Sequence, residues 1–432
     1  MFLPLFIALL ASTSPMLRAM DDFDTLMKQG RAAWENADIE LASAKYQMAC
    51  TAEKLKAYPP ERVASCEHHL ATISSARDNM PEAERHFLLA VESWKAAGPR
   101  ALTLQAVSLM NLGELYRRFH RMDDAERALT QALEIVGKFE DQPGLMGETL
   151  SRIGFLYQET GRSVLALKTL REAVARFEES KTPSPTEQAY AINGLGMTEL
   201  ALGYQKDAEE HLEKAVQLSM TSQGPDHPET AGYQTNLALA FVLTGQFSRA
   251  TPLLRRARQV TEARGGANSV QMGLILAEMS AIDSAQGKLS LAEEHAVQAL
   301  RILSASKNAN PAAVALAQVN LADVYLHGRR LEEANRILPD AVSVERRIAP
   351  DSRLLADGLR RLADLRALQH SWKEAQDLYG EAITIYERHL GPSNPVLAPA
   401  LRGYAEALKR EGGSKEAIRS LQARAKGAAF LQ

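Results

Sequence analysis

The chain has few cysteines, no block of like charge and, beyond its N-terminus, no long apolar run. Only two of its 432 residues are cysteine, and they show no zinc-binding spacing. The 50 basic and 53 acidic residues are distributed along the length, without a basic block or a stripe of basic and aromatic side chains. These absences argue against a nucleic-acid-binding protein. No segment is biased enough in composition to predict disorder.

An apolar run, MFLPLFIALLAS, fills residues 1–12 and resembles the core of a secretory signal, with a small residue, Ala19, at a suitable cleavage point. We therefore expect residues 1–19 to be a signal peptide and the protein to be exported, either to a periplasm or outside the cell. A cytoplasmic protein is the alternative, because Arg18 follows the run, no basic residue precedes it, and translation could begin at Met20. No later segment has the roughly 18–20 apolar residues of a membrane-spanning helix.

The sequence carries none of the short motifs typical of enzymes. It has no HExxH zinc motif, no phosphate-binding loop and no GxSxG nucleophile motif. His68 and His69 are adjacent, but neighbouring side chains on a helix point about 100° apart and do not converge. His211 and His295 each follow a glutamate on a predicted helix, and we interpret them as solvated surface residues. We therefore expect no metal, no cofactor and no catalytic residue.

Self-comparison of the sequence shows a repeat of 41 or 42 residues that recurs ten times. Each repeat contains a small residue, and an alanine follows it twelve positions later in all ten repeats. The small residues are Gly30, Ala71, Gly113, Gly154, Gly196, Ala238, Ser280, Ala322, Ala363 and Ala405, and the alanines are Ala42, Ala83, Ala125, Ala166, Ala208, Ala250, Ala292, Ala334, Ala375 and Ala417.

Further positions follow each of these alanines with the spacing of a helix. A large apolar residue comes four positions later in nine repeats, and a second alanine comes seven positions later in nine. Such residues share one face of a helix, where small side chains let a neighbouring helix approach and large ones fill the space between. Proline and glycine clusters such as residues 224–228 (GPDHP) and 391–395 (GPSNP) separate many repeats. Each repeat is therefore predicted to be a helix, a short turn and a second helix.

This pattern resembles the tetratricopeptide repeat. The third repeat carries it most fully, in Leu112, Gly113, Tyr116, Ala125, Leu129 and Ala132. The period exceeds the usual length of about 34 residues, and the longer period with a GPxHP phrase is similar to the kinesin-light-chain type. The resemblance implies an all-α fold: an α-solenoid superhelix of about ten helix-turn-helix repeats over residues 20–428, followed by a short tail, 429–432. The residues that depart from the pattern at the aromatic position are Ala33, Ser74, Glu199, Asp283 and Arg366.

The resemblance also implies a non-catalytic scaffold whose first helices line a concave face that binds a protein or peptide. Asparagine recurs two residues before the small position, at Asn111, Asn236 and Asn320. An amide can donate and accept hydrogen bonds at the same time, so these side chains could pair with a peptide backbone. The alternative is that they cap helices or bind water.

Apolar residues occupy the same face in the fourth to seventh repeats. They are Phe155, Met197, Leu200, Leu239, Val242 and Leu243. Because the outer repeats place charged residues there, an apolar centre with a charged rim is expected, as at a partner site. Tighter coiling that buries these residues between repeats is the alternative. A self-assembling structural protein remains the second hypothesis for function, and an enzyme with an unrecognised site is the third.

The two cysteines fall in adjacent helices of the predicted stack. Cys50 lies near the end of the second helix of the first repeat, and Cys66 near the start of the next helix. Since these helices are antiparallel neighbours, both thiols lie at the same end of the stack. They form either a disulfide, as an exported protein allows, or two small buried residues.

One histidine lies between prolines, in the phrase at residues 224–228. The equivalent phrase at residues 391–395 has Asn394 in place of His227. Asparagine cannot replace histidine in proton transfer, but both can cap a helix that opens with proline. We therefore interpret His227 as a capping residue, with Pro228 and Pro395 at the first helical position.

Overall fold

The computed structural model describes residues 15–36, 38–182, 184–264, 266–306 and 309–429. Most of the predicted signal peptide and the last three residues of the predicted tail lie outside these ranges. The chain divides into two compact units, residues 1–140 and 141–432.

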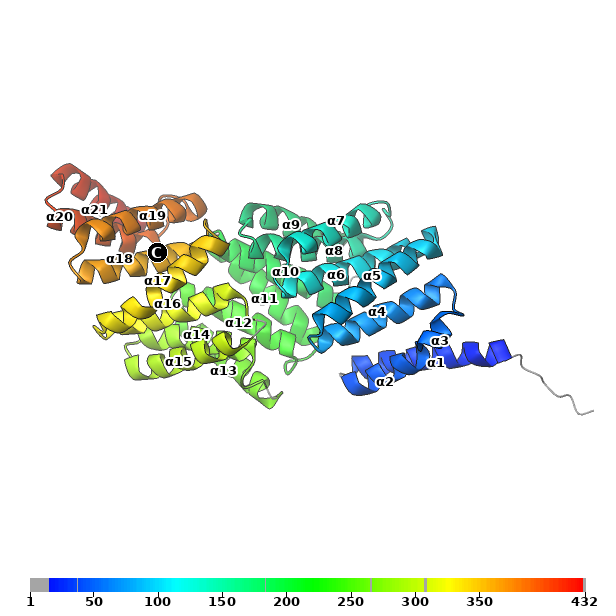
Figure 1. Ribbon diagram of the computed structural model, residues 1–432. Helices are drawn as coiled ribbons and strands as arrows, with labels where there is room; N and C mark the ends of the chain where they lie inside the picture. Colours follow the sequence, from blue (N-terminus) through cyan, green and yellow to red (C-terminus); the bar gives the residue numbers. More distant parts are fainter. Residues whose placement is uncertain (1–14, 37, 183, 265, 307–308, 430–432) are drawn as a thin grey trace, which may run out of the picture. The chain divides into compact units, whose positions relative to one another are not determined.

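The first unit contains three helix-turn-helix pairs (Figure 1). They are α1 (Pro15–Glu35) with α2 (Ile39–Ala49), α4 (Pro60–Ala76) with α5 (Met80–Ala97), and α6 (Leu102–Arg118) with α7 (Met122–Val136). Two short elements join these pairs, α3 (Ala52–Leu55) and the 3-10 helix η1 (Pro99–Ala101).

The second unit contains seven further pairs. They are α8 (Pro143–Glu159) with α9 (Ser163–Glu179), α10 (Pro185–Ala201) with α11 (Gln205–Ser222), α12 (Pro228–Leu243) with α13 (Phe247–Ala263), α14 (Val270–Ala285) with α15 (Leu289–Ala305), α16 (Pro311–His327) with α17 (Leu331–Ile348), α18 (Arg353–Leu368) with α19 (Trp372–Leu390), and α20 (Leu397–Arg410) with α21 (Lys415–Ala429). The described residues thus form ten pairs, one for each predicted repeat, and the prediction of an all-α solenoid is confirmed.

The small repeat position is where the two helices of a pair approach most closely. A Cβ atom built on Gly154 would lie 2.5 Å from Cγ of Leu170, the large apolar residue of the same repeat. Ser280 is a larger residue than glycine or alanine, and its repeat has Ala296 in place of the large side chain; the Ser280 hydroxyl donates to the carbonyl oxygen of Ala292 (2.8 Å). In this pair a larger residue at the small position is thus offset by a smaller one on the second helix, as close packing requires.

In nine repeats a residue with positive φ lies in the turn between the first and the second helix. It lies seven positions after the small residue, and the equivalent position of the first repeat lies outside the described residues. Five of the nine are glycine, which reaches this conformation without steric cost. The other four are Asp78, His120, Arg329 and His370. The left-handed residue lets the chain reverse directly into the second helix.

The second unit coils back on itself, because the fifth and ninth repeats of the chain, which both belong to this unit, are in contact. Gly203, in the turn after α10, packs against Leu390 at the end of α19. Arg353 Nη1 donates to the carbonyl oxygen of Leu200 at 3.4 Å, across 153 positions of sequence. The first helices of the intervening repeats therefore enclose a hollow within this unit.

Candidate peptide-binding groove

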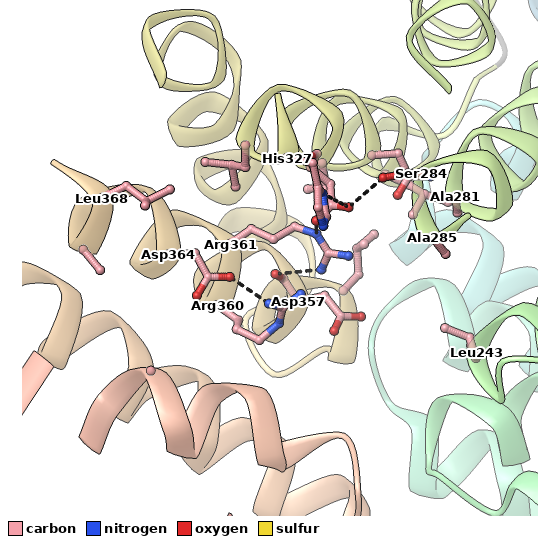
Figure 2. Close-up of a pocket in the computed structure, with 18 of the residues that line it drawn as sticks. Leu243, Ala281, Ser284, Ala285, His327, Asp357, Arg360, Arg361, Asp364 and Leu368 are labelled. Carbon is pink, nitrogen blue, oxygen red and sulfur yellow. Dashed lines mark hydrogen bonds and ion pairs between the residues drawn. The ribbon is translucent and has the colours of Figure 1, made fainter. Parts of the chain in front are cut away.

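A groove of about 950 Å³ is formed by the first helices of the last five repeats, α12, α14, α16, α18 and α20. Its apolar side comes from α12, α14 and the start of α16 and includes Leu239, Val242, Leu243, Ala281 and Leu316. Charged side chains of α16 and α18 face them across the space, as Figure 2 shows for Arg361, Asp357 and Leu243. We call this space the groove.

The apolar side is contributed by residues that the repeat pattern does not require for packing within a pair. Leu239, Val242 and Leu243 are partly buried against the core of their own repeats and keep a face toward the groove. Apolar surface of this kind favours contact with a partner over contact with water.

An ion pair between neighbouring repeats lies at the centre of the charged side (Figure 2). Arg361 Nε donates to Asp323 Oδ1 at 2.9 Å. Burial alone would raise the pKa of Asp323, but Arg361, His327 and Arg360 outweigh it and hold that pKa well below its usual range. The Asp323 carboxylate in turn raises the pKa of His327 to about 9 through its hydrogen bond. Asp323, Arg361 and His327 are therefore all charged at neutral pH.

Two acids of α18 accept hydrogen bonds from tyrosines of α19. Tyr379 donates to Asp364 at 2.5 Å, and Arg360 donates to the other oxygen of that carboxylate at 2.8 Å. Tyr386 donates to Asp357 at 2.5 Å. These contacts fix the charged side of the groove in one arrangement, so little conformational entropy is lost there when a ligand binds.

Glu278 of α14 differs from the other acids of the groove. It lines the groove with 5% of its surface exposed. No hydrogen bond or ion pair from any described residue reaches its carboxylate, and burial raises its pKa to about 7. The sequence analysis did not single it out, although it occupies the repeat position of the three predicted asparagines, two residues before Ser280.

The three predicted asparagines make hydrogen bonds to the preceding repeat. Asn236 Nδ2 donates to Asn193 Oδ1 at 2.9 Å, and Asn320 Nδ2 donates to the carbonyl oxygen of Ala277 at 3.1 Å. Asn111 lies 3.5 Å from His68 Nε2 in the first unit. Only Asn320 lines the groove. These amides therefore tie successive first helices together, a role that neither sequence hypothesis considered.

The structure separates the predicted apolar residues into two groups. Leu239, Val242 and Leu243 line the groove. The other three lie outside its lining: Phe155 stacks on Tyr190 with ring centroids 4.2 Å apart, Met197 packs against the core of repeats five to seven, and Leu200 is 3% exposed. Coiling buries Leu200 between repeats, as the alternative interpretation proposed.

Models of known families match most of the chain. The MalT-like TPR region matches residues 200–426, more than half of the chain. The chain belongs to the tetratricopeptide repeat family. A second tetratricopeptide repeat model matches residues 62–138 and 145–221. The assignment of the repeat from sequence is confirmed.

Among curated proteins, Protein KINESIN LIGHT CHAIN-RELATED 3 of Arabidopsis thaliana is 28% identical over 153 residues. The match covers 34% of this chain and 24% of that protein, so the chain spans about a quarter of its relative's length. This distant relationship agrees with the kinesin-light-chain character of the 42-residue tetratricopeptide repeat.

Two solved structures share the fold. A Rap protein complexed with Competence and Sporulation Factor is 13% identical with a TM-score of 0.59, over 78% of this chain and 88% of that one. Apo RapI is 16% identical with a TM-score of 0.51, over 66% of this chain and all of the other. At these identities the likeness concerns the tetratricopeptide fold alone.

Two histidines of the tetratricopeptide repeats are not the solvated residues that we expected. His295 is 6% exposed, and its Nδ1 lies 2.9 Å from Asp283 Oδ2. His211 Nδ1 lies 2.7 Å from Glu199 Oε2. Both acids replace the aromatic residue of the first helix, and each histidine follows its acid by twelve positions. The interpretation was wrong because it considered the second helix alone, whereas the acid across the pair supplies the partner.

A third acid–histidine pair, this one buried, lies in the second repeat. His86 occupies the same repeat position as His211 and His295, and its Nδ1 lies 2.5 Å from Glu67 Oε2. Here the acid comes from a different position of the first helix. All three histidines lie three positions after the recurring alanine, a spacing that would have added His86 to the two named from the sequence.

The structure joins Cys50 to Cys66 by a disulfide between the end of α2 and α4, with Cα atoms 5.5 Å apart. Both cysteines are buried. The bridge encloses the short helix α3 and therefore fixes the first helix pair of the tetratricopeptide stack to the second.

His227 is the N-cap residue of α12, and its Nδ1 accepts from the backbone N–H of Glu229 at 3.3 Å. Pro228 opens that helix, as predicted. The position of Pro395 was predicted wrongly, because α20 begins at Leu397. Asn394 instead accepts from the backbone N–H of Val396 at 3.0 Å in the turn before the helix.

The described residues hold no group of three or more histidine, cysteine, aspartate or glutamate side chains arranged to bind a metal ion. Among the described helices, none combines the length and the apolar character that crossing a bilayer requires.

Proposed function

We propose that this tetratricopeptide repeat protein is a non-catalytic binding protein that holds an extended peptide segment in the groove. The observation that carries the proposal is the pairing of an apolar side, Leu239 to Leu243, with a fixed charged side across about 950 Å³. Ligand sites typically combine a mostly apolar lining with a few fixed polar groups. The Rap complex with Competence and Sporulation Factor supports this use of the fold, but not the identity of any ligand of this chain.

The shape of the groove favours a peptide over a folded domain. The groove lies inside the second unit, where contact between the fifth and ninth repeats of the chain limits the approach of a folded domain. An extended chain can enter such a space and place alternate side chains against the two sides.

Selection from a phage-displayed library of random dodecapeptides on the full chain tests this function. Val242→Asp places a charge on the apolar side of the groove and should lower peptide affinity by tenfold or more, about 1.4 kcal/mol. The matched control is Val164→Asp, because Val164 is 72% exposed on α9 and lies outside the groove. Circular dichroism melting of both variants checks that they fold.

Two outcomes would contradict the proposal. One is failure of the library to enrich any sequence; the other is equal affinity of the selected peptides for Val242→Asp and the unmodified chain. Light scattering over a range of concentrations addresses self-assembly, the competing function: reversible association that Val242→Asp abolishes would favour it.

We further propose that the protein is exported to an oxidising compartment. The disulfide between Cys50 and Cys66 supports this, because such bridges persist outside the reducing cytosol. Alkylation of protein taken directly from its host provides the test. Both thiols should resist alkylation until a reductant is added, and free thiols at both positions would reject the proposal.

A further inference from the structure

Glu278 is a buried acid in the groove without a partner of opposite charge. It is 5% exposed and contributes to the groove lining. Burying a carboxylate without a hydrogen bond or a counter-charge is costly, and proteins rarely keep such a group without a use. The missing partner is therefore the main chemical clue to what the groove binds.

The helices packed against α14 supply no counter-charge. On α16, Asp323 pairs with His327 of the same helix and with Arg361 of α18. On α15, His295 pairs with Asp283 of α14 itself. On α13, Arg258 pairs with Glu262 of the same helix. Where α12 faces the groove its residues are apolar, and Glu229 is exposed in its first turn.

The two arginines that α18 contributes to the groove are already engaged. Arg360 pairs with Asp364, and Arg361 pairs with Asp323. Arg329 is exposed in the turn that follows α16. The acid Glu406 pairs with Arg410. Glu278 thus remains without a counter-charge, between the apolar residues of α12 and the ion pair of α16 and α18.

We propose that the groove selects a peptide carrying a basic side chain, which places its ammonium or guanidinium group against Glu278 while a neighbouring apolar side chain packs on Leu239 and Leu243. This inference rests on the proposed function, since it names the ligand class of the same groove. A cation at Glu278 supplies the missing charge and hydrogen bonds. Apolar side chains next to it exclude water and strengthen the contact.

Occupation of this site requires an ionised Glu278. Burial raises the pKa of Glu278 to about 7, so the free protein holds it mostly protonated near pH 6 and mostly ionised near pH 8. A lysine side chain stays charged throughout this range, since its pKa is about 10.4. Affinity for a lysine peptide should therefore rise as pH increases from about 6 to about 8.

Fluorescence polarisation with four pools of acetylated, amidated and labelled heptapeptides tests the proposal on the full chain. Each pool has a fixed central residue, Lys, Gln, Glu or norleucine, flanked by mixtures of Leu, Ala and Ser. The lysine pool should bind about tenfold more tightly than the glutamine pool, as one charge-assisted hydrogen bond predicts. Glu278→Gln should remove this preference and its pH dependence, and Glu278→Lys should shift the preference to the glutamate pool.

Glu294→Gln is the matched control, because Glu294 is exposed on α15 and lies outside the groove. It should keep the lysine preference. If no pool binds the unmodified chain, the proposed function fails. If the pools bind and Val242→Asp weakens them, yet Glu278→Gln keeps the lysine preference, this inference alone is overturned. Thermal melting of Glu278→Gln distinguishes lost binding from unfolding.

Discussion

His211 Nδ1 lies 2.7 Å from Glu199 Oε2, across the two helices of one repeat. The Glu199 side chain is 1% exposed, and Arg171 of the preceding repeat approaches its other oxygen at 3.4 Å. Asp283 and His295 form the same contact two repeats later. An acid can therefore replace the aromatic residue of the first helix when a histidine faces it from the second helix.

This relationship predicts how stability depends on pH. The hydrogen bond that His211 donates to the Glu199 carboxylate raises the pKa of His211 above 6.5, against a smaller opposing effect of burial. A group whose pKa is higher in the folded state adds stability below its unfolded pKa and loses it as pH rises through its folded pKa. His211→Gln should therefore lower the melting temperature more near pH 5.5 than near pH 8.5, where the two proteins converge.

Glu199→Gln provides the control for this prediction. In that background the neighbouring charges on His211 are Glu210 and Lys214, which act in opposite directions. His211→Gln should then have an effect that hardly varies with pH, as a double-mutant cycle will reveal. Equal pH dependence in both backgrounds would mean that the pair does not set the pKa of His211.

The sequence predicted the elements that depend on local spacing. Small and large residues recur at helical intervals, so the ten helix pairs and the closeness of Gly154 to Leu170 were accessible without a structure. Contacts between distant repeats were not, because spacing within a repeat carries no record of how tightly the solenoid coils. The hydrogen bond from Arg353 to the carbonyl oxygen of Leu200 depends on that coiling, and so does the enclosure of the groove.

The asparagine column illustrates the same limit within the candidate site. Spacing placed Asn236 and Asn320 on the inner face, and the structure agrees that Asn320 lines the groove. Spacing did not indicate their partners in the preceding repeat, since these follow from how one repeat rotates against the next. Glu278 was missed because its repeat position also holds lysine, histidine, arginine and glycine, so a single glutamate there does not form a motif.

The small repeat position should tolerate little added volume. Gly154→Val would drive two methyl groups into Leu170, which is fully buried and cannot swing aside. Alanine is accepted at this position in the sixth repeat, where Ala238 shares a repeat with Leu254, but valine exceeds that space. We expect a loss of about 1–3 kcal/mol in the free energy of unfolding by urea, the usual cost of overpacking.

Gly380→Val is the matched control for Gly154→Val. Gly380 lies inside α19, and a Cβ built there meets no atom within 4 Å. Its unfolding free energy should stay within about 0.5 kcal/mol of the unmodified chain, as at most surface sites. Comparable destabilisation by both variants would show that contact with Leu170 does not determine the result, because valine has a higher helix propensity than glycine at both sites.

The hydrogen bond between Asn236 and Asn193 allows structural and ligand-binding roles to be separated. Asn193 is 5% exposed, so Asn236→Ala leaves its Oδ1 without the donor at 2.9 Å. This should lower the unfolding free energy by about 1–3 kcal/mol, the cost of an unsatisfied buried group. Replacing both residues by alanine should cost less than the sum of the single changes, which urea unfolding of the two single variants and the double variant will measure.

Peptide affinity measures whether the three asparagines also contribute to ligand binding. Asn320 lines the groove and bonds to a backbone carbonyl, so Asn320→Ala should weaken selected peptides modestly, by about threefold, if its remaining amide atoms contact the ligand. Asn111 lies outside the groove lining, and Asn111→Ala should leave the affinity unchanged. If alanine at all three asparagines lowers stability and leaves affinity intact, the asparagines only join successive repeats, and recognition depends on the apolar side and the charges of the groove.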